Sequence, residues 1–450
     1  MALDLGALKE SLRQRGIDVL RVMYSDVLGI PRSKDLLVSN IDRSAHGGPT
    51  FCQGIWNTNT QGGVLDAANI LSDGLQDLVG RIEPETITPM PWEPGVAYVI
   101  MDAREPNGNP NLFSPRTALQ LIIAKYQELG LRPIVGPELE FYIADRTPEG
   151  GFKRSLDRTG RAYTTGSLVD PHGTFLHLMR MLDQMDIGVY AGNHEFSPGQ
   201  YEINIWHSDA LDAADRALMF KAAIKDMVHR TGQHATFMGK PWSDEGGSGF
   251  HLHFSVVDAN GKNLMDNGSG ELSEVAQRLI AGITAHASGL TALTNPSINA
   301  FKRLGPDTLA PFRANWGYDN RSCMVRIPPE RGSGTRLEVR VGDGAANPYL
   351  MIAGILGAGL LGILNKLECP EPAEGMAYEN EGAPVLPTTF TDALEALEQD
   401  NELRGLISDS LIEIFLTLKR DELERYNSEV GQLHGRTVSE WEIREYMEDF

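Results

Sequence analysis

Residues 135–142 read Val-Gly-Pro-Glu-Leu-Glu-Phe-Tyr, a segment typical of a buried β-strand except for its two acids. Successive side chains on a strand point to opposite faces. Glu138 and Glu140 therefore share one face, and Leu139 and Phe141 share the other. The segment predicts an amphipathic strand whose polar face carries carboxylates.

Three further segments have related patterns. Residues 249–255 and 336–340 alternate apolar and ionisable side chains, and residues 193–202 carry two acids around a Pro-Gly turn. For any one strand, a solvated outer face is a sufficient explanation. Solvated faces usually draw on Lys, Thr, Ser and Gln, however, and no lysine occurs on these. Their polar residues are Glu195, Glu202, His251, His253, Ser255, Arg336, Glu338 and Arg340.

If the four segments converge, they form a site of five carboxylates and one imidazole. Five like charges cannot share a desolvated site unless cations neutralise them. Two divalent ions would bring the sum to −5 + 4 = −1. Oxygen ligands with one imidazole and no thiolate favour Mg²⁺ or Mn²⁺ over zinc. The predicted ligands are Glu138, Glu140, Glu195, Glu202, Glu338 and His251.

A cluster of arginines follows the acidic segments, at positions 303, 321, 326, 336 and 340. Each alone is equally well explained as a surface residue. Together with a two-metal site they favour an anionic substrate, because guanidinium groups bind phosphate and carboxylate oxygens. The sequence contains no GxxxxGK[ST], HExxH or GxSxG motif, which sets aside P-loop, zincin and serine-hydrolase chemistry.

Composition limits the possible partners and compartment. The 450 residues carry 40 Lys and Arg against 61 Asp and Glu, a net charge of −21, which disfavours binding to nucleic acid. Three cysteines without CxxC spacing fit a reducing cytoplasm. The longest apolar stretch, residues 349–364, is too short to span a bilayer and predicts a buried helix. We therefore expect a cytoplasmic protein with no membrane partner.

The chain divides at a polar segment rich in turn formers, residues 104–111. Residues 1–105 have the texture of a small β-rich domain, and residues 106–450 mix helices and strands in an α+β catalytic domain. Predicted helices cover 117–130, 173–185, 210–229, 273–293, 348–367, 391–400 and 403–424; predicted strands cover 19–24, 133–143, 202–205, 249–257, 324–327 and 336–341.

The chain resembles the glutamine synthetase family along most of its length, from Tyr24 to Trp441. The motifs that carry this resemblance occur in the family's order: GPELEFYI (136–143), HEFSPGQYEI (194–203), GGSGFHLHFS (246–255), NPSINAFKRL (295–304), NRSCMVRIP (320–328) and RLEVRVGDGAANPYL (336–350). The resemblance implies a β-grasp N-terminal domain and a catalytic domain built on a curved antiparallel sheet. It also implies a homo-oligomer of stacked hexameric rings, with active sites at subunit junctions.

The resemblance also implies roles for individual residues. Glu140, Glu195 and Glu202 resemble the ligands of a first metal, and Glu138, His251 and Glu338 those of a second. Gly247, Arg303 and Arg340 resemble the groups that hold glutamate. Arg321 and Arg326 resemble phosphate-side arginines, and His253 and Ser255 nucleotide contacts. Weaker matches are Asp77, an acid supplied across the subunit junction, and Tyr163. The implied chemistry is phosphorylation of the γ-carboxylate of glutamate by ATP, followed by displacement of phosphate by an amine.

The sequence departs from the glutamine-forming enzymes where ammonia is handled. Those enzymes carry a glutamate six residues after the arginine of the KRL motif, where this chain has Leu309. They also carry an FDGSS-like segment, whereas residues 49–56 here contain no acid. Gly246 stands where an asparagine usually begins the NGSG loop. The two lost carboxylates favour a γ-glutamylamine ligase that uses polyamines or alkylamines. The alternatives are a true glutamine synthetase using ammonium and a non-catalytic structural relative.

Overall fold

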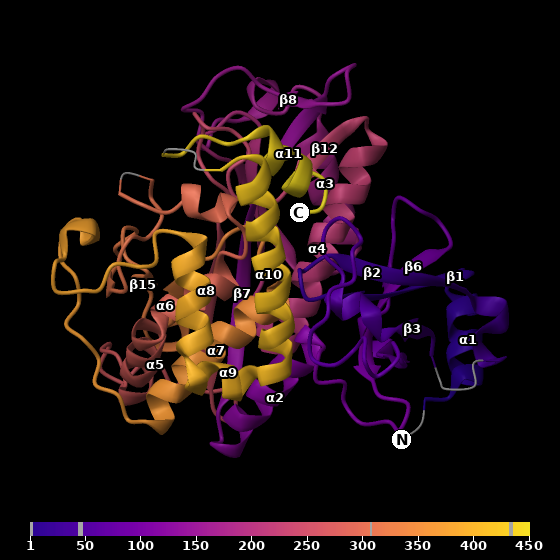
Figure 1. Cartoon of the computed structure of the whole chain (residues 1–450), viewed down its shortest axis with the longest axis horizontal. Coiled ribbons are helices and arrows are strands. Elements are labelled where there is room, and N and C mark those ends of the chain that lie inside the picture. Colours follow the sequence, from indigo (N-terminus) through magenta and orange to yellow (C-terminus); the bar gives the residue numbers. More distant parts are fainter. Residues whose placement is uncertain (1–2, 44–47, 307, 432–434) are drawn as a thin grey trace.

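The computed structural model describes residues 3–43, 48–306, 308–431 and 435–450. It contains two β-sheets, with most of the helices packed around the larger one (Figure 1). The first sheet has the strand order β2–β1–β6–β4–β3, with β5 paired to β6, and only β1 and β6 run parallel among its described pairs. Its elements are α1 (Leu5–Gln14), β1 (Val19–Ser25), β2 (Pro31–Leu37), β3 (Thr50–Cys52), β4 (Asp77–Ile82), β5 (Thr88–Pro89) and β6 (Val96–Arg104).

The second sheet is built around the long strand β7 (Arg132–Arg146). Its order is β14–β15–β16–β13–β7–β10–β9, and β8, β11 and β12 also pair with β7. The strands β14 and β15 are parallel, whereas the other described pairs are antiparallel. The remaining strands are β8 (Phe152–Arg154), β9 (Val189–His194), β10 (Gln200–Ile205), β11 (Ser208–Asp209), β12 (Gln233–Thr236), β13 (Phe250–Val257), β14 (Trp316–Tyr318), β15 (Val325–Ile327) and β16 (Leu337–Val339).

Helices pack against the second sheet, and α7 lies deepest among them. Its 17 residues are buried as far as Gly362, which confirms the prediction of a core helix. In Figure 1, α8 and α10 cross in front of β7. The helices are α2 (Pro115–Glu128), α3 (Thr174–Gln184), α4 (Ala210–Arg230), α5 (Glu274–Ala285), α6 (Ala287–Thr294), α7 (Pro348–Leu364), α8 (Phe390–Gln399), α9 (Asn401–Ile407), α10 (Asp409–Glu429) and α11 (Glu440–Tyr446).

The predicted α+β fold, with a small β domain before a large and mostly antiparallel sheet, is confirmed. Two predicted helices are wrong in extent, since each is two helices. The segment 273–293 breaks at His286, whose ring bonds Asp400 at 2.8 Å. The segment 403–424 breaks at Ser408, whose hydroxyl accepts the amide of Leu411 and so caps α10.

Buried ion pairs join the first sheet to the helices of the catalytic body. Arg116 on α2 pairs with Asp102 on β6 and, at 2.8 Å, with Asp215 on α4. The hydroxyl of Tyr349 on α7 donates to the same Asp215 at 2.7 Å. Breaking such a pair would leave a buried charge uncompensated, so these contacts fix the first sheet against the catalytic helices. Within the described ranges, no helix combines the length and the apolar character needed to cross a lipid bilayer.

Candidate active site

The register of the central strands brings the predicted acids together. On β7, Glu138 pairs with His251 of β13, and Glu140 pairs with Glu202 of β10. On the far side of β13, His253 pairs with Glu338 of β16. Residues widely separated in sequence therefore face one region of the sheet, because antiparallel pairing places them directly opposite one another.

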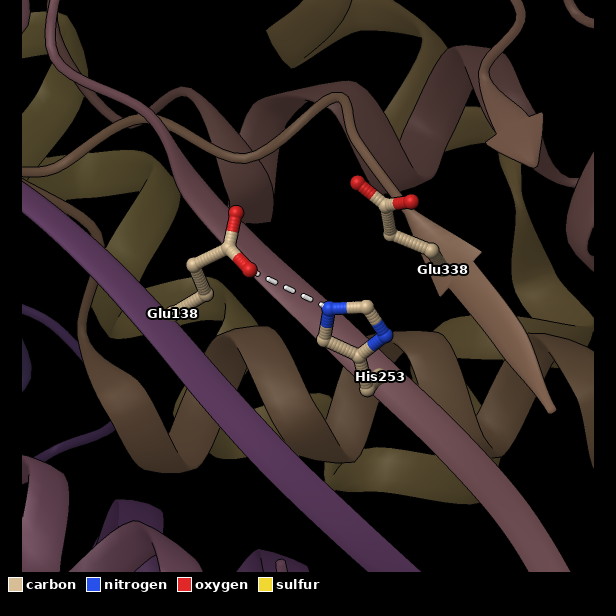
Figure 2. Close-up of side chains that lie close together, drawn as sticks. All are labelled: Glu138, His253 and Glu338. Atoms are coloured by element: carbon tan, nitrogen blue, oxygen red, sulfur yellow. Dashed lines mark hydrogen bonds and ion pairs between the residues drawn. The ribbon is translucent and has the colours of Figure 1, made fainter. Parts of the chain in front are cut away.

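Glu138, His253 and Glu338 form the most compact group, and Figure 2 shows them converging from three strands. One ligand atom from each lies within 4.8 Å of the others. The carboxylate of Glu138 also contacts Nδ1 of His251 at 2.9 Å and Nε2 of His253 at 3.2 Å. Nδ1 of His251 lies 4.0 Å from Glu338. His251 and His253 thus face the same two acids, Glu138 and Glu338.

The carboxylates differ in their tendency to ionise. Burial disfavours the charge on Glu138, but hydrogen bonds from His251 and His253 hold its pKa well below the ordinary value. Burial likewise opposes ionisation of Glu338, but the charges of Arg340, His251 and His253 together outweigh it, so that its pKa falls to about 2. This half of the site is therefore anionic at neutral pH.

The other half of the site, which contains Glu195 and Glu202, has carboxylates with raised pKa values. Burial, followed by the charges of Glu138 and Glu140, raises the pKa of Glu202 to about 9. Burial and Glu140 raise the pKa of Glu195 to about 7. These carboxylates repel one another in a partly buried region, and a bound cation would relieve that repulsion. The donor set, all oxygen apart from imidazole, fits hard divalent ions.

Two arginines bind the anionic half directly. Arg326 donates to Glu338 at 2.6 Å and to Asp319 at 2.6 Å. Arg340 pairs with Glu338, and its other nitrogens donate to the carbonyls of Arg321 at 3.1 Å and Leu309 at 3.5 Å. The side chain of Arg321 is exposed. The carbonyl of Leu309 therefore contacts the same guanidinium group as the carboxylate of Glu338. The residue Leu309 is 55% exposed.

Arg303 is buried behind a glycine-rich loop, residues 246–249. Its two terminal nitrogens donate to the carbonyls of Val341 at 3.2 Å and Arg340 at 3.4 Å. A Cβ on Gly247 would lie 2.6 Å from Cγ of Arg303, so only glycine allows the loop to pass this close. The neighbouring Gly246 is fixed through its backbone, which accepts a hydrogen bond from the hydroxyl of Tyr142 at 2.6 Å.

A cavity of about 290 Å³ opens beside Glu138 and His253, and Ser255 lines it. Sequence reasoning missed two of its aromatic residues, Tyr190 and Trp206, whose rings stack at 4.2 Å and are half exposed. Trp206 directly follows β10. A tryptophan next to a strand that carries an acid was the signal in the sequence that could have indicated this cavity wall. Another wall residue, Arg336, donates from Nε to Nδ1 of His253 at 3.1 Å.

Two weaker sequence matches, Asp77 and Tyr163, do not line this cavity. Asp77 is exposed at the start of β4, where it pairs with Cys52. Tyr163 is exposed, although its backbone amide donates to the carbonyl of His194 at 2.9 Å. Position 307, between Arg303 and Leu309, lies outside the described residues.

Comparison with known proteins identifies the family. Residues 112–446 match the family model described as "Glutamine synthetase, catalytic domain". The chain is similar to proteins named glutamine synthetase from Halobacterium salinarum (31% identity, covering 99% of this chain and 96% of the relative) and Thermus thermophilus (32%, 97% of each). It is also similar to the solved structure of a GmaS/ADP complex, with a TM-score of 0.84, 32% identity and 99% of each chain covered.

The chain therefore belongs to the glutamine synthetase family. It is an ATP-dependent ligase that forms a C–N bond between glutamate and ammonia or an amine, and the expectation of an enzyme is confirmed. Members of this family use divalent metal ions together with ATP.

Proposed function

We propose that this enzyme is a γ-glutamylamine synthetase, which phosphorylates the γ-carboxylate of glutamate with ATP and condenses the product with an organic amine. The observation that carries this proposal is Leu309. Its side chain is half exposed and its carbonyl faces Arg340, a residue we assign to the substrate. An aliphatic group beside the reacting carboxylate offers an ammonium ion no counter-charge, whereas it packs favourably against an alkyl chain.

The N-terminal segment that departs from the family pattern supports the same conclusion. Residues 49–56 contain no acid, and Phe51 lies 4.8 Å from the ring of Tyr24. The ammonium group of Lys34 lies 4.7 Å from the centre of the Phe51 ring. An aromatic surface that already carries a cation is a poor site for NH₄⁺. A structurally similar protein, GmaS, has been solved with ADP, which supports nucleotide binding in this fold.

We assign two divalent ions, Mg²⁺ or Mn²⁺, to the acidic cluster. Glu140, Glu195 and Glu202 would hold one, and Glu138, His251 and Glu338 the other, with His253 close enough to Glu138 to contribute. When bound, the ions would neutralise the carboxylates and the phosphate oxygens of ATP. The chain's own part is to hold these side chains in register on β7, β10, β13 and β16, with Glu195 directly after β9.

The remaining residues position the two substrates. His253, Ser255, Arg321 and Arg326 would contact the nucleotide, and the stacked rings at positions 190 and 206 offer its base an aromatic face. Arg303, Arg340 and the backbone of Gly247 would hold glutamate. Arginines suit this chemistry, because phosphoryl transfer depends on positioning and charge neutralisation more than on a protein nucleophile.

We further propose the larger organisation that the family suggests. Residues 1–105 would form the N-terminal β-grasp domain and residues 106–450 the catalytic domain. The enzyme would act in the cytoplasm as a homo-oligomer of stacked hexameric rings, with polyamines or alkylamines as the second substrate.

The test is phosphate release from ATP in the presence of glutamate and a panel of nitrogen donors: ammonium, methylamine, ethanolamine and putrescine. We expect an organic amine to give the highest kcat/KM. The product is identified by mass, which separates a γ-glutamylamide from glutamine. If ammonium gives the highest kcat/KM, the enzyme is a glutamine synthetase and the argument from Leu309 fails.

A further inference from the structure

Asp343 is a buried acid that the ligase chemistry does not yet use. It follows β16 and has no exposed surface. Its Oδ1 accepts the amide of Ala345 at 2.9 Å, whereas its Oδ2 has no hydrogen-bond partner among the described residues. A buried carboxylate oxygen without a donor is costly, and its retention calls for an explanation.

The carboxylate faces the glycine layer that supports Arg303. A Cβ on Gly239 would lie 1.7 Å from Oδ2 of Asp343, and the carbonyl of Gly239 would lie 2.7 Å from a Cβ on Gly247. Asp343 also forms an isolated bridge with Gly249, and a Cβ on Gly249 would lie 2.9 Å from Nη2 of Arg303. The backbone of these glycines, which carry no side chains, therefore lies between Asp343 and Arg303.

Arg303 is buried, with only 5% of the residue exposed. Its side chain donates hydrogen bonds to two backbone carbonyls, and no ion pair to Arg303 occurs within the described part of the chain. Burial lowers the pKa of Arg303, and Asp343 opposes that effect more strongly than Glu140 does. A carboxylate that forms neither a hydrogen bond nor an ion pair with this arginine thus favours its charged form.

We propose that Asp343 is a positioning residue for the acid substrate: it stabilises the charged guanidinium group of Arg303 without an ion pair, and so leaves free for the substrate those N–H groups of Arg303 that do not bond the carbonyls of Val341 and Arg340. A direct ion pair would occupy those donors, which a substrate carboxylate needs for a bidentate contact. The carboxylate of Asp343, separated from Arg303 by the glycine backbone, does not compete with the substrate for these donors. Lys221, whose ammonium group donates to the carbonyls of Gly344 at 2.9 Å and Ala346 at 3.4 Å, holds the same loop in place.

The proposal rests on the assignment of Arg303 to glutamate, and the experiment separates the two. Asp343→Asn keeps the shape of the side chain and its acceptor for Ala345 but removes the charge. We expect the KM for glutamate to rise about tenfold at pH 8, with the KM for ATP within about twofold of the wild-type value. The matched control is Asp26→Asn, which neutralises a buried acid that pairs with Arg32 instead; it should leave the KM for glutamate unchanged.

A double-mutant cycle with Arg303→Lys tests whether Asp343 acts through the arginine. If it does, the double variant loses less glutamate affinity than the product of the two single losses. Independent losses, or an unchanged KM for glutamate in Asp343→Asn, would overturn the proposal. If Arg303→Lys alone leaves that KM unchanged, the assignment of Arg303 fails instead. If neither Asp343→Asn nor Asp343→Ser folds, the carboxylate serves the loop and the proposal is wrong.

Discussion

Glu202 gives a prediction that separates a cation site from a merely polar face. Its pKa is raised from 4.5 to about 9 by burial and by the neighbouring acids. A folded-state pKa above the unfolded value means that the folded protein binds the proton more tightly. Its contribution to stability is therefore complete below pH 4.5 and is lost as the pH rises towards 9.

The size of this loss follows from the pKa difference. Each pH unit in that window costs about 1.36 kcal/mol, so the step from pH 5 to pH 8 costs at most about 4 kcal/mol. Because Glu202 shares its repulsion with Glu138 and Glu140, we expect about half of that, ~2 kcal/mol. Glu202→Gln keeps the side chain's shape and removes the titration.

The assay is urea unfolding in EDTA. At pH 8, Glu202→Gln should be more stable than the wild type by ~2 kcal/mol, and at pH 5 the two should be alike. Added Mg²⁺ should stabilise the wild type more than the variant, because a ligand stabilises the folded state that binds it and the variant loses a ligand of one of the two proposed ions. Glu149→Gln, at an exposed loop acid, is the control and should change neither result. A wild type as stable as the variant at pH 8 in EDTA would refute the reasoning.

Four further substitutions test the rest of the site. Glu138→Ala should lower kcat by at least about a hundredfold while circular dichroism stays unchanged, since it removes a proposed ligand and its charge; activity restored by excess Mg²⁺ would contradict this. Leu309→Glu should shift the ratio of kcat/KM for ammonium over methylamine at least about tenfold towards ammonium, and an unchanged ranking of amines would show that this position does not select the nucleophile. Gly247→Ala should raise the KM for glutamate, because its Cβ would lie 2.6 Å from Arg303; the KM for ATP serves as the internal control. Trp206→Ala should weaken ADP binding in calorimetry about fivefold or more through lost stacking, and equal affinity would place the base elsewhere.

The convergence of the acids was predictable where a strand is long enough to show alternation. Glu138 and Glu140 lie on a 15-residue strand and His251 on an eight-residue one, so a period of two identified their shared face. Glu338 lies on a strand of only three residues, yet the alternation of residues 336–340 still identified its face. The pairing of His253 with Glu338 depends on long-range register, which local sequence does not encode.

Features that depend on side-chain contacts across the fold were not predictable. The break at Ser408 follows from a capping hydroxyl inside an otherwise periodic helix. Tyr190 and Trp206 lie 16 positions apart and meet because β9 pairs with β10. The unpartnered oxygen of Asp343 depends on the close packing of Gly239, which becomes visible only when the loops are folded together.

The two ends of the reaction have different freedom to evolve. The proposed metal ligands at positions 138, 140, 202, 251 and 338 stand on strands that pair on both sides, where a substitution disturbs neighbours on both sides. Position 309 lies on an irregular segment and contacts the catalytic centre through its main chain. Descendants of such a protein could therefore exchange one nitrogen source for another by altering a few loop positions, while the side chains on the central strands stay unchanged.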